Sequence, residues 1–348
     1  MELTIIIDYL IISIIASMAI NSIFRNYAKN NNLLVDLPDR SRKFHKRPTP
    51  LTGGLGIFIA ILLSGKLYID LNNLNGYLPN FTYYLMVSSI PVLLLFLIDD
   101  FRGLRVSQRL LIQTSISIFM IYTTGVQLES FGNLFGFGSI NLGILSLPVT
   151  IFCVVGVMNA FNMIDGINGL CSGCAMLGLL FIGFYSGFIY DSMLILIIGS
   201  MIGFLIFNLR IFGKKRGVFL GDSGSNLIGF WVAWSAIYCS QNQLYGVESI
   251  TMIWFVAIPL LDCIGLIFYR IKKGINVSSP GRDHIHHKLM NRYSPELTLA
   301  IILLVSLITG LIGIFLDNIF PSFISTYAFI AYAGCYYLYA YYYANYKT

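Results

Sequence analysis

The sequence predicts an all-α, polytopic integral membrane helix bundle with about eleven transmembrane helices, its N-terminus outside and its C-terminus cytoplasmic. Three observations predict this fold class. Of the 348 residues, 57% are hydrophobic and only 11% are charged, and the mean hydropathy is +0.76, whereas a water-soluble domain carries roughly 25% charged residues. The apolar runs approach the roughly 20 residues of helix that cross a bilayer core. No segment alternates in polarity as the strands of a membrane barrel do.

The apolar runs give the order of the spans. The segments between them are too short for a further folded domain, so residues 1–348 are interpreted as a single transmembrane domain. Gly166, Gly169 and Gly173 interrupt the fifth to seventh runs, where a broken or re-entrant helix is an alternative. The predicted spans cover residues 3–23, 51–70, 80–98, 107–124, 144–163, 168–188, 190–209, 225–240, 250–270, 297–316 and 322–344.

Basic residues predict the orientation, because Lys and Arg of short loops stay on the cytoplasmic side. With eleven spans and an outside N-terminus, every Lys and Arg except Lys66 falls in an inner segment. Basic residues follow the first span rather than precede it, which is the reverse of a cleavable signal peptide. The net charge of +6 then faces anionic lipid, and nothing in the sequence indicates a nucleic-acid partner. Cys171 and Cys174 have CxxC spacing but lie within a span, where small residues pack helices.

Polar residues gather at the inner ends of the predicted spans, whereas a transporter is expected to place them near the bilayer midplane. Four motifs carry them, and we expect the four to converge on one inner-face site. The motifs are LIDDFRGL with Asp99 and Asp100, NAFNMIDGINGL with Asn159, Asn162, Asp165 and Asn168, FLGDSGS with Asp222, and GRDHIHHKL with His284, His286 and His287.

The acidic motifs suit a hard divalent cation. Adjacent carboxylates such as Asp99 and Asp100 repel each other, and a cation relieves the repulsion; the alternative is a solvated helix end. Mg²⁺ prefers oxygen ligands and binds through one or two carboxylates together with substrate phosphates. Asp222, among small residues before the eighth span, is the strongest candidate ligand. The backbone N–H groups at the start of that helix are also expected to point at an anion.

The other two motifs suit substrate contacts. If the fifth span stays helical to its inner end, Asn159, Asn162 and Asp165 share one face; hydrogen bonding between helices is the alternative for each Asn. Gly166 and Gly169 permit a tight turn and a close approach to a ligand. The three histidines have poor spacing for zinc, so contacts to a diphosphate or sugar are preferred.

These motifs, from about Arg42 to Arg292, resemble those of the polyprenyl-phosphate N-acetylhexosamine 1-phosphate transferases, and the likeness is strongest to the WecA-type undecaprenyl-phosphate N-acetylglucosaminyl 1-phosphate transferases. The resemblance implies a transferase in the bacterial cytoplasmic (inner) membrane, with its active site on the cytoplasmic face and Mg²⁺ as cofactor, or Mn²⁺ as a substitute. It implies transfer of N-acetylhexosamine 1-phosphate, with GlcNAc favoured, from a UDP-sugar to undecaprenyl phosphate, with release of UMP. The product starts a lipid-linked surface glycan such as the O-antigen of lipopolysaccharide. A homodimer is compatible with these motifs, which do not specify the oligomeric state.

By the same resemblance, Asp222 and Asn162 bind Mg²⁺, while Asp99 and Asp100 position or deprotonate the lipid phosphate. The residues expected to act in catalysis are Asp99, Asp100, Asp165 and Asp222. Those expected to bind substrate are Asn159, Asn162, Asn168, Arg109, His284, His286, His287 and Lys46, with Arg47 as a further phosphate candidate.

One departure from the family concerns Asn168, because many bacterial relatives have DGIDGL where this chain has DGINGL. Asn168 cannot act as a general base, but its amide can hydrogen-bond a uracil edge. Asp262, in PLLDC of the ninth span, is either a functional intramembrane acid or a helix contact.

Two other functions are alternatives for the whole protein. They are phospho-N-acetylmuramoyl-pentapeptide transfer, whose histidine loop differs from HIHHKL, and transport of lipid-linked sugars without UMP release.

Overall fold

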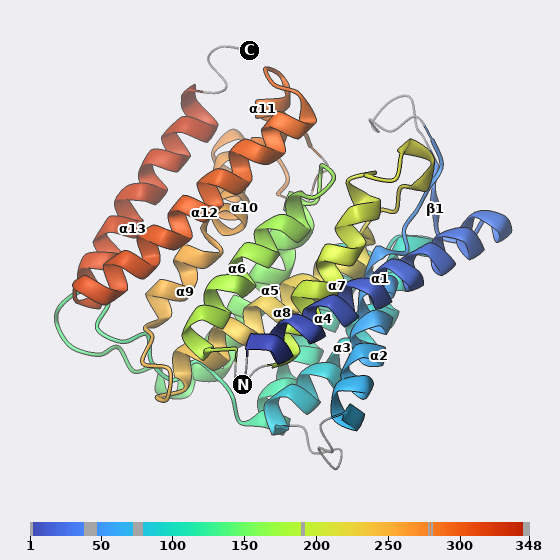
Figure 1. Ribbon diagram of the computed structural model, residues 1–348. Helices are drawn as coiled ribbons and strands as arrows, with labels where there is room; N and C mark the ends of the chain where they lie inside the picture. Colours follow the sequence, from blue (N-terminus) through green and yellow to red (C-terminus); the bar gives the residue numbers. More distant parts are fainter. Residues whose placement is uncertain are drawn as a thin grey trace. The chain divides into compact units, whose positions relative to one another are not determined.

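A computed structural model describes residues 3–37, 47–71, 79–188, 192–277, 279 and 281–343. It is helical, and within these residues a helix lies over each of the eleven predicted ranges (Figure 1). The helices are α1 (Leu3–Asn31), α2 (Gly53–Leu71), α3 (Asn80–Arg102), α4 (Val106–Thr124), α5 (Ser146–Ile164), α6 (Leu170–Ser186), α7 (Ser192–Asn208), α8 (Gly221–Gln241), α9 (Ser249–Phe255), α10 (Ala257–Lys273), α11 (Ile285–Met290), α12 (Pro295–Ile319) and α13 (Ser322–Tyr337). Short helical turns add η1 (Gly143–Leu145), η2 (Lys214–Arg216) and η3 (Leu338–Tyr343).

Several helices have the length and composition of membrane spans. Four in the described part of the chain are long and apolar enough to cross a bilayer: α1, α3, α5 together with η1, and α12. The bent pair α9 and α10 makes a fifth if it is counted as one span, and α2, α6 and α7 are apolar but shorter. The prediction of a polytopic helical membrane protein is confirmed, while the count of eleven spans and the orientation stay predictions.

The chain forms two compact units. The first comprises Met1–Gln108 and Ser186–Leu227, and the second comprises Arg109–Tyr185 and Ile228–Thr348. In the first unit α1 packs against both α2 and α7. Glycine allows the close approach of α7, because a Cβ on Gly203 would lie 2.6 Å from the Ile14 carbonyl oxygen. Small residues at such contacts are typical of helix packing in membranes.

A short backbone ladder lies beside these helices in the first unit. Strand β1 (Val35–Asp36) pairs antiparallel with β2 (Thr49–Pro50). The ladder continues beyond β2, because the N–H of Phe219 donates to the Pro50 carbonyl at 2.8 Å and the N–H of Gly53 donates to the Phe219 carbonyl at 3.0 Å. The PTPLTGG segment therefore holds the FLGDSGS segment just before α8 begins.

The second unit contains the interrupted helix. The predicted ninth span is two helices, α9 and α10, which meet at Val256 with a bend of 86°. Pro259 favours the break, because it lacks an N–H and its ring clashes with the carbonyl four residues earlier, that of Phe255. The interruption considered for the fifth to seventh spans thus lies in the ninth, whereas α5, α6 and α7 are each continuous.

Helix α12 is central to the second unit, where it contacts α9, α10, α11 and α13. At its last turn the Asp317 carboxylate accepts hydrogen bonds from the Tyr185 hydroxyl at 2.7 Å and the Thr251 hydroxyl at 2.6 Å. Its outward face exposes Leu304, Leu311 and Phe315 by 51–56%. An apolar exposed face of this kind suits contact with lipid.

Candidate active site

In the first unit, Asp100 lies against the start of α8. Its Oδ1 accepts a hydrogen bond from the backbone N–H of Asp222 at 2.7 Å, and its Oδ2 accepts one from the N–H of Ser223 at 3.1 Å. These N–H groups belong to the first turn, where a helix leaves donors without intrahelical partners and where its dipole favours a negative charge. The structure thus brings together two of the predicted acidic residues, Asp100 and Asp222.

Glycines make this contact possible. Gly221 has a positive φ of 78°, and a Cβ there would lie 2.8 Å from Oδ2 of Asp100. Gly54 and Gly224 touch at the next turn, because a Cβ on Gly54 would lie 2.5 Å from the Gly224 Cα. The small residues of FLGDSGS are therefore required by the close approach of α3 and the PTPLTGG segment.

Asp99 has a different position from its neighbour. It is buried, and its Oδ1 accepts a hydrogen bond from the N–H of Leu104 at 2.5 Å, just beyond the C-terminus of α3. The same turn is closed by the N–H of Gly103, which donates to the Asp99 carbonyl at 2.8 Å. Asp99 therefore fixes the turn from α3 to α4, which sets the direction in which Asp100 points.

The Asp100 and Asp222 carboxylates repel each other. Their donor atoms are all oxygen, which suits Mg²⁺, and Asp222 is half-buried and so is open to a ligand. Within the described residues, no group of three or more His, Cys, Asp or Glu side chains is arranged to hold a metal ion. The residues fit an ion that is held by one or two carboxylates and completed by water or substrate oxygens.

In the second unit, the polar face of α5 ends at Asp165. Asn159 and Asn162 are helical, whereas Asp165 is the first residue beyond the helix, where its N–H donates to the Asn162 carbonyl at 3.3 Å. The Asn159 amide donates to the Gln113 side chain at 2.9 Å and to the Val155 carbonyl at 2.7 Å. Asn159 thus makes the contact between helices that was the alternative to substrate binding, while Asn162, Asp165 and Asn168 are each half-buried.

The turn after α5 lies against the histidine motif. Gly169 has a positive φ of 83°, which allows the chain to turn into α6. A Cβ on Gly166 would overlap Nε2 of His286. The sequence predicts that a ligand approaches Gly166 closely. In the structure the group that lies against Gly166 is the imidazole of His286.

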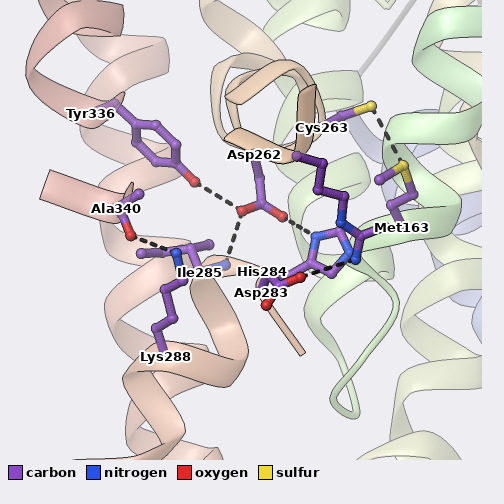
Figure 2. A network of polar contacts seen from close by, with 10 residues as sticks. Met163, Asp262, Cys263, Asp283, His284, Ile285, Lys288, Tyr336 and Ala340 are labelled. Carbon is purple, nitrogen blue, oxygen red and sulfur yellow. Dashed lines mark hydrogen bonds and ion pairs between the residues drawn. The ribbon is translucent and has the colours of Figure 1, made fainter. Parts of the chain in front are cut away.

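Asp262 organises the histidine motif, as Figure 2 shows. This buried carboxylate accepts a hydrogen bond from the backbone N–H of Ile285 at 2.9 Å and lies 2.7 Å from Nδ1 of His284. The Tyr336 hydroxyl donates to the same carboxylate at 3.4 Å. A carboxylate at Nδ1 favours the tautomer with a proton there, so Nε2 of His284 becomes the acceptor. Asp262 therefore both caps α11 and orients His284.

The other two histidines are neutral near pH 7. Burial lowers the pKa of His286 to about 3, with a smaller contribution from His287. Burial also lowers the pKa of His287 to about 4, and His284 contributes next. The rings of His284 and His286 are stacked, with centroids 5.5 Å apart, and those of His286 and His287 are 4.1 Å apart. Neutral imidazoles can accept as well as donate hydrogen bonds to a substrate.

Two further residues, Arg270 and Lys288, position this motif. In the sequence they indicate only the orientation of the spans, as basic residues of predicted inner segments. The buried Arg270 donates to the Val277 carbonyl at 2.8 Å and pairs with Asp283 at 3.1 Å, so it ties both residues to α10. Lys288 donates to the Ala340 carbonyl in η3 at 2.7 Å. No local signal marks either residue, because the partners lie in irregular segments or at the far end of the chain.

The remaining predicted residues are the basic ones. Arg109 is half-buried in the first turn of α4. Lys46 lies outside the described residues, and Arg47 lies two residues before β2.

Comparison with known proteins places this site in a family. Residues 82–240 match the family described as Glycosyl transferase family 4. The chain is 33% identical to the undecaprenyl-phosphate alpha-N-acetylglucosaminyl 1-phosphate transferase of Yersinia pestis over 286 residues, which cover 81% of this chain and 76% of that protein. The chain belongs to this transferase family.

Other relatives agree. The Escherichia coli K12 protein of the same name is 32% identical, with the same coverage of 81% and 76%. A probable undecaprenyl-phosphate N-acetylglucosaminyl 1-phosphate transferase of Bacillus subtilis is 28% identical over 292 residues, which cover 82% of this chain and 77% of that protein. The family resemblance read from the four motifs is therefore confirmed. The residues matched by the glycosyl transferase family 4 model run from the first turn of α3 to the last turn of α8, and so include Asp100, Asp165 and Asp222.

Proposed function

We propose that this protein transfers N-acetylhexosamine 1-phosphate, with GlcNAc as the sugar, from a UDP-sugar to undecaprenyl phosphate. A phosphate oxygen of the lipid attacks the phosphorus that bears the sugar, the bond between the two donor phosphates breaks, and UMP leaves. The similarity over 81% of the chain carries the proposal, because the relatives' names specify the lipid acceptor and the transferred group. The site chemistry agrees, since phosphoryl transfer asks a protein mainly for positioning and charge neutralisation.

Mg²⁺, with Mn²⁺ as a substitute, is the proposed cofactor, held by Asp222 with Asn162 as the second predicted protein ligand. When bound, the ion neutralises charge on the donor diphosphate. The repulsion between Asp100 and Asp222 supports this assignment, because a cation relieves it. Asp100 sets the start of α8 and hence the direction of Asp222, and with Asp99 it is the candidate for handling the lipid phosphate.

The second unit is proposed to bind the donor. The neutral imidazoles of His284, His286 and His287 contact the diphosphate and sugar, with His284 oriented by Asp262. Asp165 and Asn168 are proposed to hold the uridine, with Asn168 in a binding role because an amide is no base. Arg109 and Lys46 are proposed phosphate contacts.

The proposed setting is the bacterial inner membrane with the site on the cytoplasmic face. The basic residues around the predicted inner segments support this orientation. The lipid-linked product would then initiate a surface glycan such as an O-antigen.

The test is incubation of the purified protein with undecaprenyl phosphate, Mg²⁺ and a panel of UDP-sugars. We expect UMP release with UDP-GlcNAc, and none when the lipid is omitted. Release with UDP-N-acetylmuramoyl-pentapeptide alone would replace the proposed donor. Movement of lipid-linked sugar across vesicles without any UMP release would contradict a transferase.

A further inference from the structure

A cavity of about 520 Å³ opens beside α1 in the first unit. Its wall on α1 consists of residues three or four apart, which share one helix face. The end of α7 and the segment after it form the other wall. The lining residues are Ile15, Met18, Ala19, Ser22 and Arg25 of α1, with Phe207, Phe212 and Arg216.

Part of the cavity wall is apolar and exposed. Ile15 is 60% exposed and Phe212 is 46% exposed, whereas Phe207 is buried and packs edge-on against Phe212. Because α1 has the length and apolar composition of a membrane span, this exposed surface faces acyl chains. The apolar side chains of the wall therefore suit a hydrocarbon chain.

The wall also holds a buried cation, Arg25, whose charge is not balanced within the described residues. Arg25 is only 9% exposed. Its Nε and Nη2 both donate to the side-chain oxygen of Asn26, at 3.2 and 2.7 Å, while its buried Nη1 has no hydrogen-bond partner in the described part of the chain. The guanidinium lies 5.5 Å from the centre of the Phe207 ring. A buried charged donor left without a partner is unfavourable, so this nitrogen is poised for an anion.

Further cations surround Arg25. Arg216, which also lines the cavity, repels it. Lys29, one turn further along α1, is repelled by Arg25, Arg210 and Arg47. Within the described residues no carboxylate contributes to the electrostatics of Arg25 or Lys29. An anion in the cavity would relieve this repulsion, and arginine suits phosphate because its planar fork donates two hydrogen bonds.

We propose that this cavity binds one anionic glycerophospholipid of the membrane. The lipid phosphate accepts hydrogen bonds from Arg25 and Arg216, and an acyl chain lies along Ile15, Met18 and Phe212. The apolar half of the cavity favours a lipid over free phosphate. None of the candidate catalytic residues lines the cavity, so the occupant is a resident lipid rather than the reacting one.

The test uses the full-length protein, delipidated in detergent and titrated with phosphatidylglycerol or with phosphatidylcholine of the same acyl chains. Native mass spectrometry counts the bound lipids. We expect one phosphatidylglycerol per chain, bound at least about ten-fold more tightly than phosphatidylcholine, because a charge-assisted hydrogen bond changes affinity by about that factor. Arg25→Gln and Arg216→Gln should each remove this preference, and Arg216→Gln carries the test if the buried Arg25 variant does not insert.

Lys215→Gln is the matched control, because Lys215 is an exposed cation in the same turn but does not line the cavity. It should bind phosphatidylglycerol as the wild type does. Ala19→Leu narrows the cavity without changing its charge and should weaken binding. Equal binding of phosphatidylcholine, an equal loss in Lys215→Gln, or stoichiometric displacement by undecaprenyl phosphate or inorganic phosphate would each overturn the proposal.

Discussion

The Asp100 carboxylate accepts a hydrogen bond from the backbone N–H of Asp222 at 2.7 Å, although the two residues are far apart in the sequence. A second hydrogen bond, from the N–H of Ser223, completes a cap on the first turn of α8. Asp100 therefore fixes the helix start from which the Asp222 side chain projects. The two carboxylates differ in role for this reason, and their substitution should have different consequences.

Asp222→Ala should abolish turnover while the protein still inserts and unfolds at nearly the wild-type temperature. Asp100→Asn should lower activity and also stability, by about 1.5–3 kcal/mol, because the cap loses a charged acceptor. UMP release and thermal unfolding followed by tryptophan fluorescence measure the two effects. Asp8→Asn, an exposed position on α1, serves as the control. Normal turnover of Asp222→Ala, or of the wild type in excess EDTA, would remove Asp222 from the proposed metal site.

Asp262→Asn tests the orientation of the histidine motif. The variant keeps the size of the side chain but loses the charge that holds Nδ1–H of His284. We expect kcat to fall about ten- to hundred-fold, by analogy with the loss of a carboxylate that orients a metal-ligating histidine. Tyr336→Phe, which removes the weaker 3.4 Å contact to the same carboxylate, should stay close to the wild type. If both variants lost activity equally, Asp262 would act through packing rather than through His284.

Gly166→Ala tests the contact between the α5–α6 turn and His286. The new Cβ would overlap Nε2 of His286, so the imidazole or the turn must move. Such overpacking costs about 1–3 kcal/mol. We expect the KM for the UDP-sugar to rise. Gly156→Ala is the matched control, since a Cβ on Gly156 of α5 would meet no atom of the described residues within 4 Å. Equal kinetics for the two variants would show that this contact is not needed.

Stability should fall on mild acidification because His286 and His287 are buried as neutral rings. Their pKa values of about 3 and about 4 lie below the value of about 6.5 for free imidazole. Between these values the unfolded chain binds protons that the folded chain does not, so lower pH favours unfolding. The contribution is complete above about pH 6.5 and is lost progressively as the pH falls towards 3 to 4.

Melting temperatures across this range provide the measurement. The wild type should melt at a lower temperature at about pH 5 than at about pH 7, and His286→Gln should reduce this difference. His284, Asp262, Asp283 and Arg282 also act on these rings, so the variant is compared at each pH with the wild type. Parallel curves for the two proteins would show that His286 does not titrate as proposed.

The helices could be predicted from the sequence because long apolar runs set them directly, but their interruptions could not. Pro91 lies inside the continuous α3, whereas Pro259 follows an 86° break. Local sequence does not separate these cases, because the break also depends on what packs beside it. Gly178 of α6 allows such packing, since a Cβ there would lie 3.3 Å from the Phe255 carbonyl oxygen.

The acidic and histidine motifs were visible as concentrations of polar residues at span ends. The different roles of the residues within each motif could not be predicted from the sequence. Asp99 and Asp100 are neighbours in sequence, yet one closes the turn after α3 and the other caps α8. In the sequence Arg270 and Lys288 do not differ from the other cations of the predicted inner loops. In the structure Arg270 pairs with Asp283, and Lys288 donates a hydrogen bond to the Ala340 carbonyl. Such roles depend on tertiary contacts, which residue spacing does not encode.

The transferase assignment is tested most directly by measuring both products of one reaction. The purified protein is incubated with undecaprenyl phosphate, Mg²⁺ and UDP-GlcNAc, after which UMP and the lipid product are quantified by mass spectrometry. We expect undecaprenyl diphosphate GlcNAc and UMP in equal amounts, with neither product formed by Asp222→Ala. UMP without the diphosphate lipid, or a lipid that carries the sugar through a single phosphate, would contradict it.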